Sequence, residues 1–508
     1  MSTVAVVRPP AIGAPLERVE DSRFLSGSGR YVDDIHLEGM LFAAVLRSSV
    51  GHGHVREIDT SAARAMPGIR AVYTHRDIDP ALRIPMRTSA LPGYERSFLQ
   101  PPLASGKVRY VGEPVALVVA NSPFLAEDAL ERITVDYDSL PAVTDWESAL
   151  GPSVLFEEAG TNIASQYRVA RGNVESAFRA APYSKRTRLY CHRHSAMPLE
   201  TRGLVADWDQ GKGRLQVWGA AKVAFANRKI LSKLLGLDET SIELLEVDIG
   251  GGFGVRGEFY PEDFLIPLAA RSLQAPVKWI EDRREHMMAT NHAREVCCDL
   301  EIACERDGTI LGLRGEVMVD LGAYVRTNGA MAPSNVAAFL PGPYRIANFA
   351  CDVNIFTSNK TPIGSYRGPG RFEANFFRER LIDIAAGELD LDPVEMRRRN
   401  LLSPQELPYD PGALIPNVTP SPYDSGDYTQ TLNTVLERSE WHALKARSGR
   451  QIDGWYHGVG LSCFVESGGA GPREAARLSL AQDGSIDLFT GCSTLGQGHE
   501  TVLAQIAA

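Results

Sequence analysis

A cluster of glycines at residues 250–254 (Gly-Gly-Gly-Phe-Gly) is the feature that most constrains how this chain can fold. It follows a mainly apolar run, residues 242–247, which predicts a largely buried strand ending at Asp248. Glycines directly after a strand let the backbone turn sharply and bring bare amide groups close to a ligand. Phe253, a bulky apolar residue inside this turn, needs something to cover it. The pattern predicts a loop that presses its backbone and one aromatic ring against a large cofactor.

Two other interpretations of this stretch stay open. The spacing G-x-G-x-x-G begins at Gly252, and a second strand-like run, residues 277–280, is followed by the acid Glu281, as in the nucleotide-binding domain of an NAD-dependent dehydrogenase. Pro261 and Pro267 argue against that interpretation, because they should interrupt the helix that binds the pyrophosphate. A turn with a purely structural role is the second alternative.

The overall composition is that of an ordinary globular protein and argues against several classes of partner. Of the 508 residues, 44% are hydrophobic and 23% are charged, and the length predicts two to four domains. The net charge of −10 and the isoelectric point near 5.7 argue against nucleic acid and anionic membrane surfaces. No apolar run is long enough to span a membrane, and residues 1–20 lack the apolar core of a signal peptide, so we expect a cytoplasmic protein.

The cysteines and histidines do not form a recognisable metal site. The seven cysteines include no C-x-x-C pair, so the sequence predicts neither an iron–sulfur nor a zinc framework in this chain. His52 and His54 alternate with glycines, and we expect a solvated turn there because no acid or cysteine stands at ligand spacing.

Alternating strand-like and helix-like segments predict a compact α/β domain near the N-terminus. Strand, helix and strand patterns occur twice, at residues 41–46, 60–66 and 69–73 and again at 115–120, 123–131 and 133–137. A second domain should contain the glycine turn and a helix over residues 371–388 with Phe377, Leu381 and Ile384 on one face. The predicted ranges are an N-terminal arm (1–25), the α/β domain (26–145), a linker (146–165), the second domain (166–403), a connecting segment (404–430) and a third domain (431–508).

The third domain is predicted to be incomplete. Residues 458–465 and 486–490 have strand patterns, and a mostly apolar helix should begin at His499. This helix runs to Ala508 with no terminal glycine and no following strand, so its sheet would lack strands. We therefore expect that further polypeptide is needed to finish this domain.

Two further glycine turns indicate that the first one does not bind its ligand alone. The second glycine turn spans residues 364–370 and contains Arg367, whose planar guanidinium suits a carboxyl, a phosphate or a polarised carbonyl oxygen. The third glycine turn spans residues 491–498, contains Gln497, and leads into the helix at His499, where amides and the helix dipole favour anions. Three such turns in separate segments predict one large ligand, with phosphate groups, that is held from several sides.

Several motifs in a consistent order resemble the molybdopterin-binding large subunits of the xanthine oxidase and aldehyde oxidase family of molybdenum hydroxylases, in particular their carbon monoxide dehydrogenase-like bacterial branch. The resemblance covers almost the whole chain. It implies an N-terminal α/β hammerhead domain followed by molybdopterin-binding domains, the last one truncated, in a mixed α/β and α+β architecture. The motifs are residues 18–35, 107–115 and 197–203, the first glycine turn, Tyr366-Arg367-Gly368, residues 397–400 and Gly496-Gln497-Gly498.

The resemblance also implies roles for individual residues. The amides around Phe253 and Gly254 would face the apical oxygen of the molybdenum, with the Phe253 ring beside the substrate path. Arg367 would orient the substrate or stabilise charge that develops on it, and Gln497 with its neighbouring glycines would bind the pterin. Lys222 stands where many members place a glutamine near the apical oxygen. The implied cofactor-binding positions are Gly251, Gly252, Phe253, Gly254, Lys222, Arg367, Gly368, Gly496, Gln497 and Gly498.

Members of this family oxidise a C–H bond in an aldehyde or an N-heteroaromatic compound and take the new oxygen from water. The resemblance therefore implies a molybdenum–molybdopterin cytosine dinucleotide cofactor, a [2Fe–2S] small subunit and an FAD medium subunit as partners, and a dimer of such heteromers. The molybdenum would be held through the pterin and not by side chains. Neither an iron–sulfur nor an FAD site is expected in this chain.

Two departures from the family pattern change these expectations. Gly368 follows the Tyr-Arg pair where carbon monoxide dehydrogenase has a copper-binding cysteine, which argues against carbon monoxide oxidation. The family's catalytic glutamate, a general base, lies in a glycine-containing motif that this chain does not contain. We therefore expect the chain by itself to be inactive. A catalytically inactive scaffold that needs a second chain is the alternative interpretation.

Overall fold

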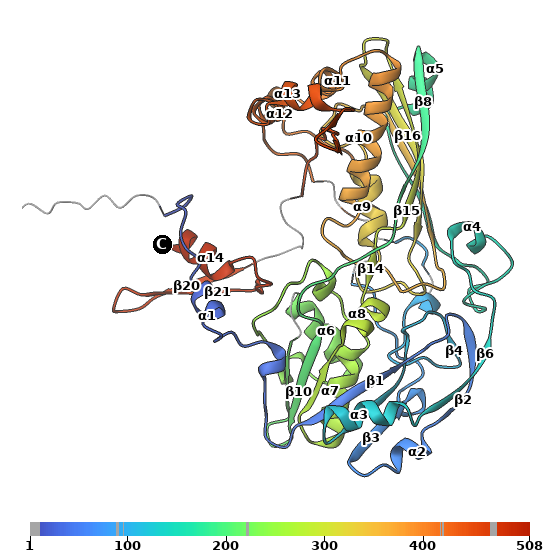
Figure 1. Cartoon of the computed structure of the whole chain (residues 1–508), viewed down its shortest axis with the longest axis vertical. Coiled ribbons are helices and arrows are strands. Elements are labelled where there is room, and N and C mark those ends of the chain that lie inside the picture. The colour runs from blue at the N-terminus through green and yellow to red at the C-terminus, as the bar shows by residue number, and fades with distance from the viewer. Residues whose placement is uncertain are drawn as a thin grey trace, which may run out of the picture.

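Two large sheets, one of seven strands and one of five, organise the molecule. The computed structural model describes residues 11–87, 91–94, 96–219, 223–416, 418, 421–467 and 475–508. Figure 1 shows the two sheets in two units, one above the other, and a smaller group of elements beside them that contains the C-terminus. None of the described helices has both the length and the apolar character needed to cross a membrane.

The lower unit in Figure 1 is built on the seven-stranded sheet, with the strand order β12-β11-β10-β13-β1-β5-β3. The apolar run predicted as a strand at 115–120 lies within β5, and all seven residues of β5 are buried, because helices and neighbouring strands hide it on every side. The strands are β1 (Leu41–Arg47), β3 (Ile69–Thr74), β5 (Pro114–Ala120), β10 (Gly203–Asp209), β11 (Arg214–Trp218), β12 (Ile242–Leu245) and β13 (Val277–Ile280). The helices of this unit are α2 (Ser61–Arg64), α3 (Pro123–Leu130), α6 (Ala224–Leu235), α7 (Glu262–Leu273) and α8 (Arg283–Ala289).

A three-stranded sheet, β4-β2-β6, lies beside the larger one and corrects the expectation for His52. His54 is exposed, but His52 is only 4% exposed and its Nδ1 lies 2.7 Å from the carbonyl oxygen of Pro141. The expected solvated turn is therefore wrong for His52, because pairing of β2 with β6 brings the segment around Pro141 over the ring. The strands are β2 (Gly53–Asp59), β4 (Lys107–Val108) and β6 (Thr134–Ser139).

The predicted boundary between the α/β domain and the second domain does not separate two sheets. β1 from the first range pairs in parallel with β13 from the second, with Leu41 opposite Val277, so both ranges contribute to one sheet. The predicted linker, residues 146–165, is also part of a core. After the short helix α4 (Trp146–Ala149), Leu155 and Phe156 are 0% and 1% exposed and pack in the upper unit. The apolar side chains of the linker explain why it is not a solvated connection.

The upper unit in Figure 1 is built on the five-stranded sheet, with the strand order β7-β17-β16-β15-β8, and helices α9 and α10 run along it. The predicted helix 371–388 is confirmed as α10, with Phe377 and Leu381 fully buried and Ile384 half-buried. The elements are β7 (Ile163–Arg171), α5 (Val174–Ala180), β8 (Tyr183–Cys191), β15 (Val296–Cys304), β16 (Ile310–Asp320), α9 (Met331–Phe339), β17 (Phe349–Phe356), α10 (Arg371–Glu388) and α11 (Pro393–Asn400). The two-residue strands β9 (His194–Ser195) and β14 (His292–Ala293) pair with each other.

Helix α7 forms although the sequence suggested that prolines would interrupt it. Pro261 is its N-cap residue, and Pro267 lies inside the helix. An interior proline removes a hydrogen bond and costs about 3 kcal/mol, and burial of Phe264 and Leu265 in the core offsets this cost. The dehydrogenase interpretation fails for another reason: β12 and β13, which flank α7, are separated in the sheet by β11 and β10, so they do not form a neighbouring βαβ pair.

The C-terminal part of the chain lies in two places, near the top of the upper unit and in the small group at the side of the molecule (Figure 1). Helices α12 (Tyr428–Arg438) and α13 (Trp441–Arg447) pack on the core of the upper unit, near the short strands β18 (Gln451–Ile452) and β19 (Trp455–Tyr456). The predicted strand 458–465 is wrong. The backbone of Cys463 bonds instead to α10 side chains, with its amide 3.0 Å from Glu379 Oε2 and its oxygen 2.7 Å from Arg378 Nη2.

The last described elements form the small group beside the lower unit (Figure 1). The predicted strand 486–490 and the helix beginning at His499 are confirmed as β21 (Ile486–Thr490) and α14 (His499–Ala507). Within the described residues, β21 pairs only with β20 (Ala476–Leu480), and every residue of β20 is exposed. Helix α1 (Asp21–Leu25) of the N-terminal arm lies against α14.

Candidate functional site

The first and second glycine turns are in direct contact. The amide of Arg367 donates a 2.9 Å hydrogen bond to the carbonyl oxygen of Phe253. Gly254 has a φ of +106°, and a Cβ atom there would lie 2.7 Å from the carbonyl oxygen of Ser365. Only glycine accommodates both the left-handed backbone and this close approach. Gly254 is therefore required for the close packing of the first turn against the second.

The third glycine turn also contacts the first one. A Cβ atom on Gly252 would lie 2.8 Å from Leu495 Cδ1. The amide of Thr494 donates a 2.7 Å hydrogen bond to the carboxylate of Glu246, directly after β12. Segments that are more than one hundred residues apart in the chain thus meet at the end of β12.

The backbone amides of the first glycine turn are available to donate hydrogen bonds to a ligand. The amides of Gly251, Gly252, Phe253 and Gly254 donate no hydrogen bond to any residue within the described ranges. Phe253 has a φ of +48° and is 46% exposed. Consecutive amides in a strained turn form a concave surface that attracts an anion or a polarised oxygen. These residues therefore fit an oxygen-rich cofactor that also covers the aromatic ring.

Glu200 and Arg256 fix the start of the first turn, and sequence reasoning assigned neither of them a role in the site. Glu200 Oε2 accepts hydrogen bonds from the amide of Gly250 at 2.8 Å and from Arg256 Nη2 at 3.0 Å. Burial raises the pKa of Glu200, and the nearby Arg256 guanidinium and the Gly250 amide partly oppose this rise. A local signal for this pair is weak, because the two residues lie 56 positions apart.

The second glycine turn presents Arg367 and Gly368 on an open side. Arg367 is exposed, and the structure gives its guanidinium no hydrogen bond to the described residues. Gly368 has a φ of +70°, and a Cβ atom there would meet nothing within 4 Å. A guanidinium next to bare backbone can bind a carboxylate, a phosphate or a carbonyl oxygen.

The N-terminus of α14, which follows the third glycine turn, was expected to bind an anion of the ligand, but a protein carboxylate occupies it. The amides of Glu500 and Thr501 donate to the carboxylate of Glu20, at 3.0 and 3.4 Å, so the N-terminus of α14 already holds an anion from the N-terminal arm. Gln497 is exposed, and its side chain contacts the amide of Leu495 and the ring of His499. Gly496 stays open, with a φ of +99° and its nearest neighbour 3.9 Å from a Cβ position.

A groove of about 1070 Å³ lies beside the third turn. It runs between the end of β12, the N-terminal arm, the β20–β21 hairpin and α14, and neither Phe253 nor Arg367 lines it. The predicted position Lys222 lies outside the described residues. The structure therefore brings the first turn into contact with the second and with the third, and the groove is lined by Cys492 and Thr494 of the third turn.

Family models match three successive stretches of the chain. A family model described as "Aldehyde oxidase and xanthine dehydrogenase, a/b hammerhead domain" matches residues 26–141. Two models described as "Molybdopterin cofactor-binding domain" match residues 155–401 and 434–508. The first and second glycine turns fall in the longer of these two matches, and the third turn falls in the shorter one.

Individual proteins are similar over nearly the whole of this chain. The 6-hydroxypseudooxynicotine dehydrogenase complex subunit gamma of Paenarthrobacter nicotinovorans is 38% identical over 98% of this chain and 63% of its own length. The carbon monoxide dehydrogenase large chain of Hydrogenophaga pseudoflava is 34% identical over 96% of this chain and 64% of its own length. The crystal structure of quinoline 2-oxidoreductase from Pseudomonas putida 86 matches with a TM-score of 0.88 at 33% identity, over 99% of this chain and 65% of that one. This chain thus spans slightly less than two thirds of the length of these proteins.

Proposed function

Because the chain belongs to the molybdopterin-binding large subunits of the xanthine oxidase and aldehyde oxidase family, we propose that its three glycine turns together hold a molybdenum cofactor. The predicted architecture, a hammerhead domain followed by molybdopterin-binding domains, is confirmed by the matching family models. The observation that carries the proposal is the contact between the turns, together with amides in residues 251–254 that donate to no described residue. A cofactor with many oxygen atoms would accept hydrogen bonds from these amides.

We assign each turn a part of this cofactor. The amides of Gly251, Gly252, Phe253 and Gly254 would face the molybdenum end, and Gly368 would let the backbone of the second turn approach it. Gly496, Gln497 and Gly498 would hold the pterin, and Lys222 would lie near the metal. The capped N-terminus of α14 supports a narrower role for the third turn, through its open glycine Gly496 and not through a helix dipole.

The reaction proposed for the assembled protein is hydroxylation of an electron-poor carbon. The bound cofactor supplies the oxidation of a C–H bond with oxygen taken from water. Within this chain, the exposed guanidinium of Arg367 would donate hydrogen bonds to a substrate oxygen or ring nitrogen and so orient the substrate. The half-exposed ring of Phe253 would pack on the substrate's flat face. No general base is assigned to this chain.

An N-heteroaromatic compound is the favoured substrate class, with an aldehyde as the other. One similar protein is named for quinoline, which is an N-heteroaromatic compound. A ring nitrogen and a flat ring would match the donors of Arg367 and the face of Phe253. Gly368, in place of a copper-binding cysteine, argues against carbon monoxide.

We propose that electrons leave through a [2Fe–2S] small subunit and an FAD medium subunit, in a dimer of heteromers. One relative is named as a subunit of a dehydrogenase complex, and another as a large chain, which supports assembly with other subunits. We further propose the cytosine dinucleotide form of molybdopterin and a cytoplasmic location.

We also propose that further polypeptide, in the same reading frame or as a separate chain, covers the β20–β21 hairpin. Leu478 and Leu480 on β20 are 59% and 75% exposed, and Phe489 on β21 is 49% exposed. A two-stranded hairpin has marginal stability without a third strand or a covering element. Relatives that are half as long again as this chain could supply such a segment within one polypeptide.

The function can be tested by producing the chain, with the further polypeptide that would complete its last domain, together with candidate [2Fe–2S] and FAD subunits in a host that makes molybdopterin. We expect molybdenum in near-stoichiometric amount and oxidation of quinoline or benzaldehyde by the purified complex. A complex that contains no molybdenum contradicts the proposal.

The role of Arg367 is tested separately in the same complex. Replacement of Arg367 by lysine should lower kcat/KM at least tenfold and leave molybdenum content unchanged, because lysine lacks the planar pair of donors. Arg380→Lys, an exposed position on α10, is the matched control and should change neither quantity. Equal kinetics in both variants would contradict the role of Arg367.

A further inference from the structure

Arg294 reaches the second glycine turn from the five-stranded sheet. It lies between β14 and β15, and its side chain is 7% exposed. Its Nη2 donates a 2.9 Å hydrogen bond to the carbonyl oxygen of Arg367. Its Nη1 lies 3.1 Å from Glu373 Oε2 and 3.5 Å from the carbonyl oxygen of Gly368. One guanidinium therefore contacts the backbone of the turn and a carboxylate outside it.

Two aromatic rings fix the plane of this guanidinium. Its central carbon lies 4.4 Å from the centre of the Phe372 ring and 5.0 Å from the centre of the Tyr366 ring. Tyr366 precedes Arg367, and Phe372 lies in the first turn of α10. Cation–π contacts of this kind hold a planar cation in one orientation. Arg294 therefore contacts residues on both sides of Arg367.

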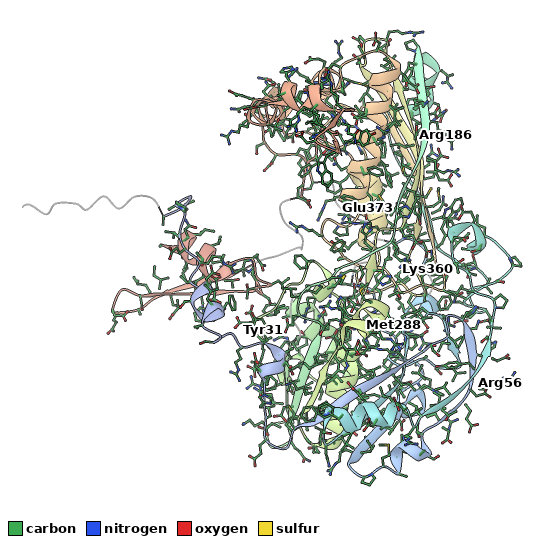
Figure 2. All side chains as sticks on the ribbon, viewed as in Figure 1. Tyr31, Arg56, Arg186, Met288, Lys360 and Glu373 are labelled. Carbon is green, nitrogen blue, oxygen red and sulfur yellow. The ribbon has the colours of Figure 1, made fainter. Side chains whose placement is uncertain are left out.

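Glu373 connects this contact to a rigid part of the molecule. It lies in the first turn of α10, at the end of that helix that is nearer the lower unit, and is 1% exposed (Figure 2). The start of α10 cannot shift easily, since a Cβ atom on Gly370 would lie 2.4 Å from the carbonyl oxygen of Ala332. Burial raises the pKa of Glu373, and the Arg294 guanidinium opposes this rise.

The backbone at Arg294 is strained in a way that supports a specific role. Arg294 has a φ of +70° and Glu295 a φ of +52°, and neither is glycine. Left-handed backbone is unfavourable for any residue that carries a Cβ atom. The Arg294 side chain contacts the second glycine turn, whereas Glu295 contacts Arg193 and Lys360. Strain of this kind persists where the surrounding contacts require it.

We propose that Arg294, held by Glu373, is the positioning residue of the second glycine turn and sets the direction in which Arg367 presents its guanidinium. The inference rests on the proposed function for the identity of the ligand that Arg367 meets. The positioning is a property of the chain without cofactor and can be measured there. Arg294 acts through Arg367 and does not itself touch the substrate.

Hydrogen exchange of the full chain without cofactor tests the positioning. The amide of Arg367, bonded to Phe253, reports on the contact between the turns. Arg294→Lys should raise the exchange of the Arg367 amide at least tenfold, because lysine lacks the second nitrogen by which the guanidinium contacts the turn and Glu373 together. Amides of β15 and β16 should keep their protection, which shows that the chain stays folded.

Arg397→Lys is the matched control. Arg397 lies on α11, is buried, and pairs at 2.8 Å with Glu379. Glu379 lies on α10, as Glu373 does, but away from the second glycine turn. The Arg397→Lys variant should leave the exchange of the Arg367 amide unchanged. Unchanged protection of the Arg367 amide in Arg294→Lys, or an equal increase in Arg397→Lys, overturns the proposal.

A second variant and a second measurement separate the positioning from the proposed function. Glu373→Gln keeps the shape of the side chain and removes its charge, so exchange of the Arg367 amide should rise less than in Arg294→Lys but above wild type. An unchanged rate there contradicts the part assigned to Glu373. In the assembled complex, Arg294→Lys should lower kcat/KM while molybdenum content stays at the wild-type level. Absence of molybdenum from the wild type would contradict the proposed function and leave the exchange result standing.

Discussion

Gly254 shows how one residue can be required by protein atoms and not by a ligand. Its φ of +106° and the 2.7 Å approach to Ser365 leave no room for a side chain. We expect Gly254→Ala to lower the free energy of unfolding by about 2–4 kcal/mol, from backbone strain and displacement of the second turn. Gly213→Ala is the control, because Gly213 also has positive φ (+60°) but has nothing within 4 Å; it should cost about 1 kcal/mol. Urea unfolding measures both values, and equal losses would contradict the account.

The sequence predicted the first glycine turn but not its contacts. The pattern of residues 250–254 indicates a sharp turn after a strand, and the structure has one. Its partners Ser365 and Leu495 come from segments more than one hundred residues away, and no local pattern specifies such a contact. Glu200, although it lies in the motif at residues 197–203, and Arg294 were missed as supporting residues for the same reason, since a single charged residue does not specify its distant partner.

A buried cluster of charged residues shows how elements are joined inside the lower unit. Arg202, on the segment before β10, lies 3.0 Å from Glu262 of α7 and 2.5 Å from Glu281 after β13, and its guanidinium is 3.9 Å from the Tyr260 ring centre. All are nearly fully buried. Burial raises the pKa of Glu262, but Arg47 and Arg202 outweigh this effect and lower it to about 2.

Removal of one partner from this cluster should be costly. Arg202→Met removes the arginine that pairs with the buried Glu281 and leaves Glu262 with Arg47 alone, and it should destabilise the protein by about 3–5 kcal/mol at neutral pH. Arg168→Met, which breaks an exposed pair with Asp352, should cost at most about 1 kcal/mol. Because the folded pKa of Glu262 is depressed, its contribution is present above its unfolded pKa and is lost as pH falls toward about 2. Similar losses in both variants at neutral pH would contradict this role.

A second contact between elements joins the N-terminal arm to α14, through Glu20 and the amides of Glu500 and Thr501. Burial alone raises the pKa of Glu20, but hydrogen bonds from Thr501 and from the amides at the start of α14 outweigh it and lower the pKa. We expect Glu20→Gln to reduce the protection of the amides of residues 502–508 about fivefold at pH 7, because a neutral acceptor interacts less with the helix N-terminus. Hydrogen exchange measures this change.

The contact between Glu20 and α14 should also depend on pH. A lowered pKa means that the stabilisation by Glu20 is present above its unfolded pKa near 4.5 and is lost as pH falls below that value. Glu17→Gln, at an exposed neighbouring position, should leave the protection of α14 unchanged. Identical protection in wild type and Glu20→Gln at pH 7 would show that the carboxylate does not hold the helix.

Elements with strong periodicity could be predicted, and elements decided by tertiary contacts could not. Helix α10 and strand β5 follow their apolar patterns. The segment 458–465 has a strand pattern, but the side chains of Glu379 and Arg378 bond its backbone. Pro267 argued against a helix at residues 262–273, but helix α7 forms there because burial of its apolar side chains in the core stabilises it.

At the scale of the whole molecule, the predicted domain boundaries do not coincide with the boundaries between the sheets. The parallel pairing of β1 with β13 joins residues that lie more than two hundred positions apart, and no local signal predicts it. The same long-range arrangement brings the three glycine turns together at the end of β12. The candidate site is therefore a product of the complete fold and not of any one domain.

Exchange of backbone amides in the presence and absence of cofactor is the most direct test of that site. The chain is produced with its partner subunits in a host that makes molybdopterin and in a host that cannot, and hydrogen exchange is compared between the two preparations. We predict bound molybdenum in the first preparation only, with added protection at residues 251–254, 366–368 and 496–498 together. Bound molybdenum with unchanged exchange at these three turns, or protection at only one of them, would contradict the account.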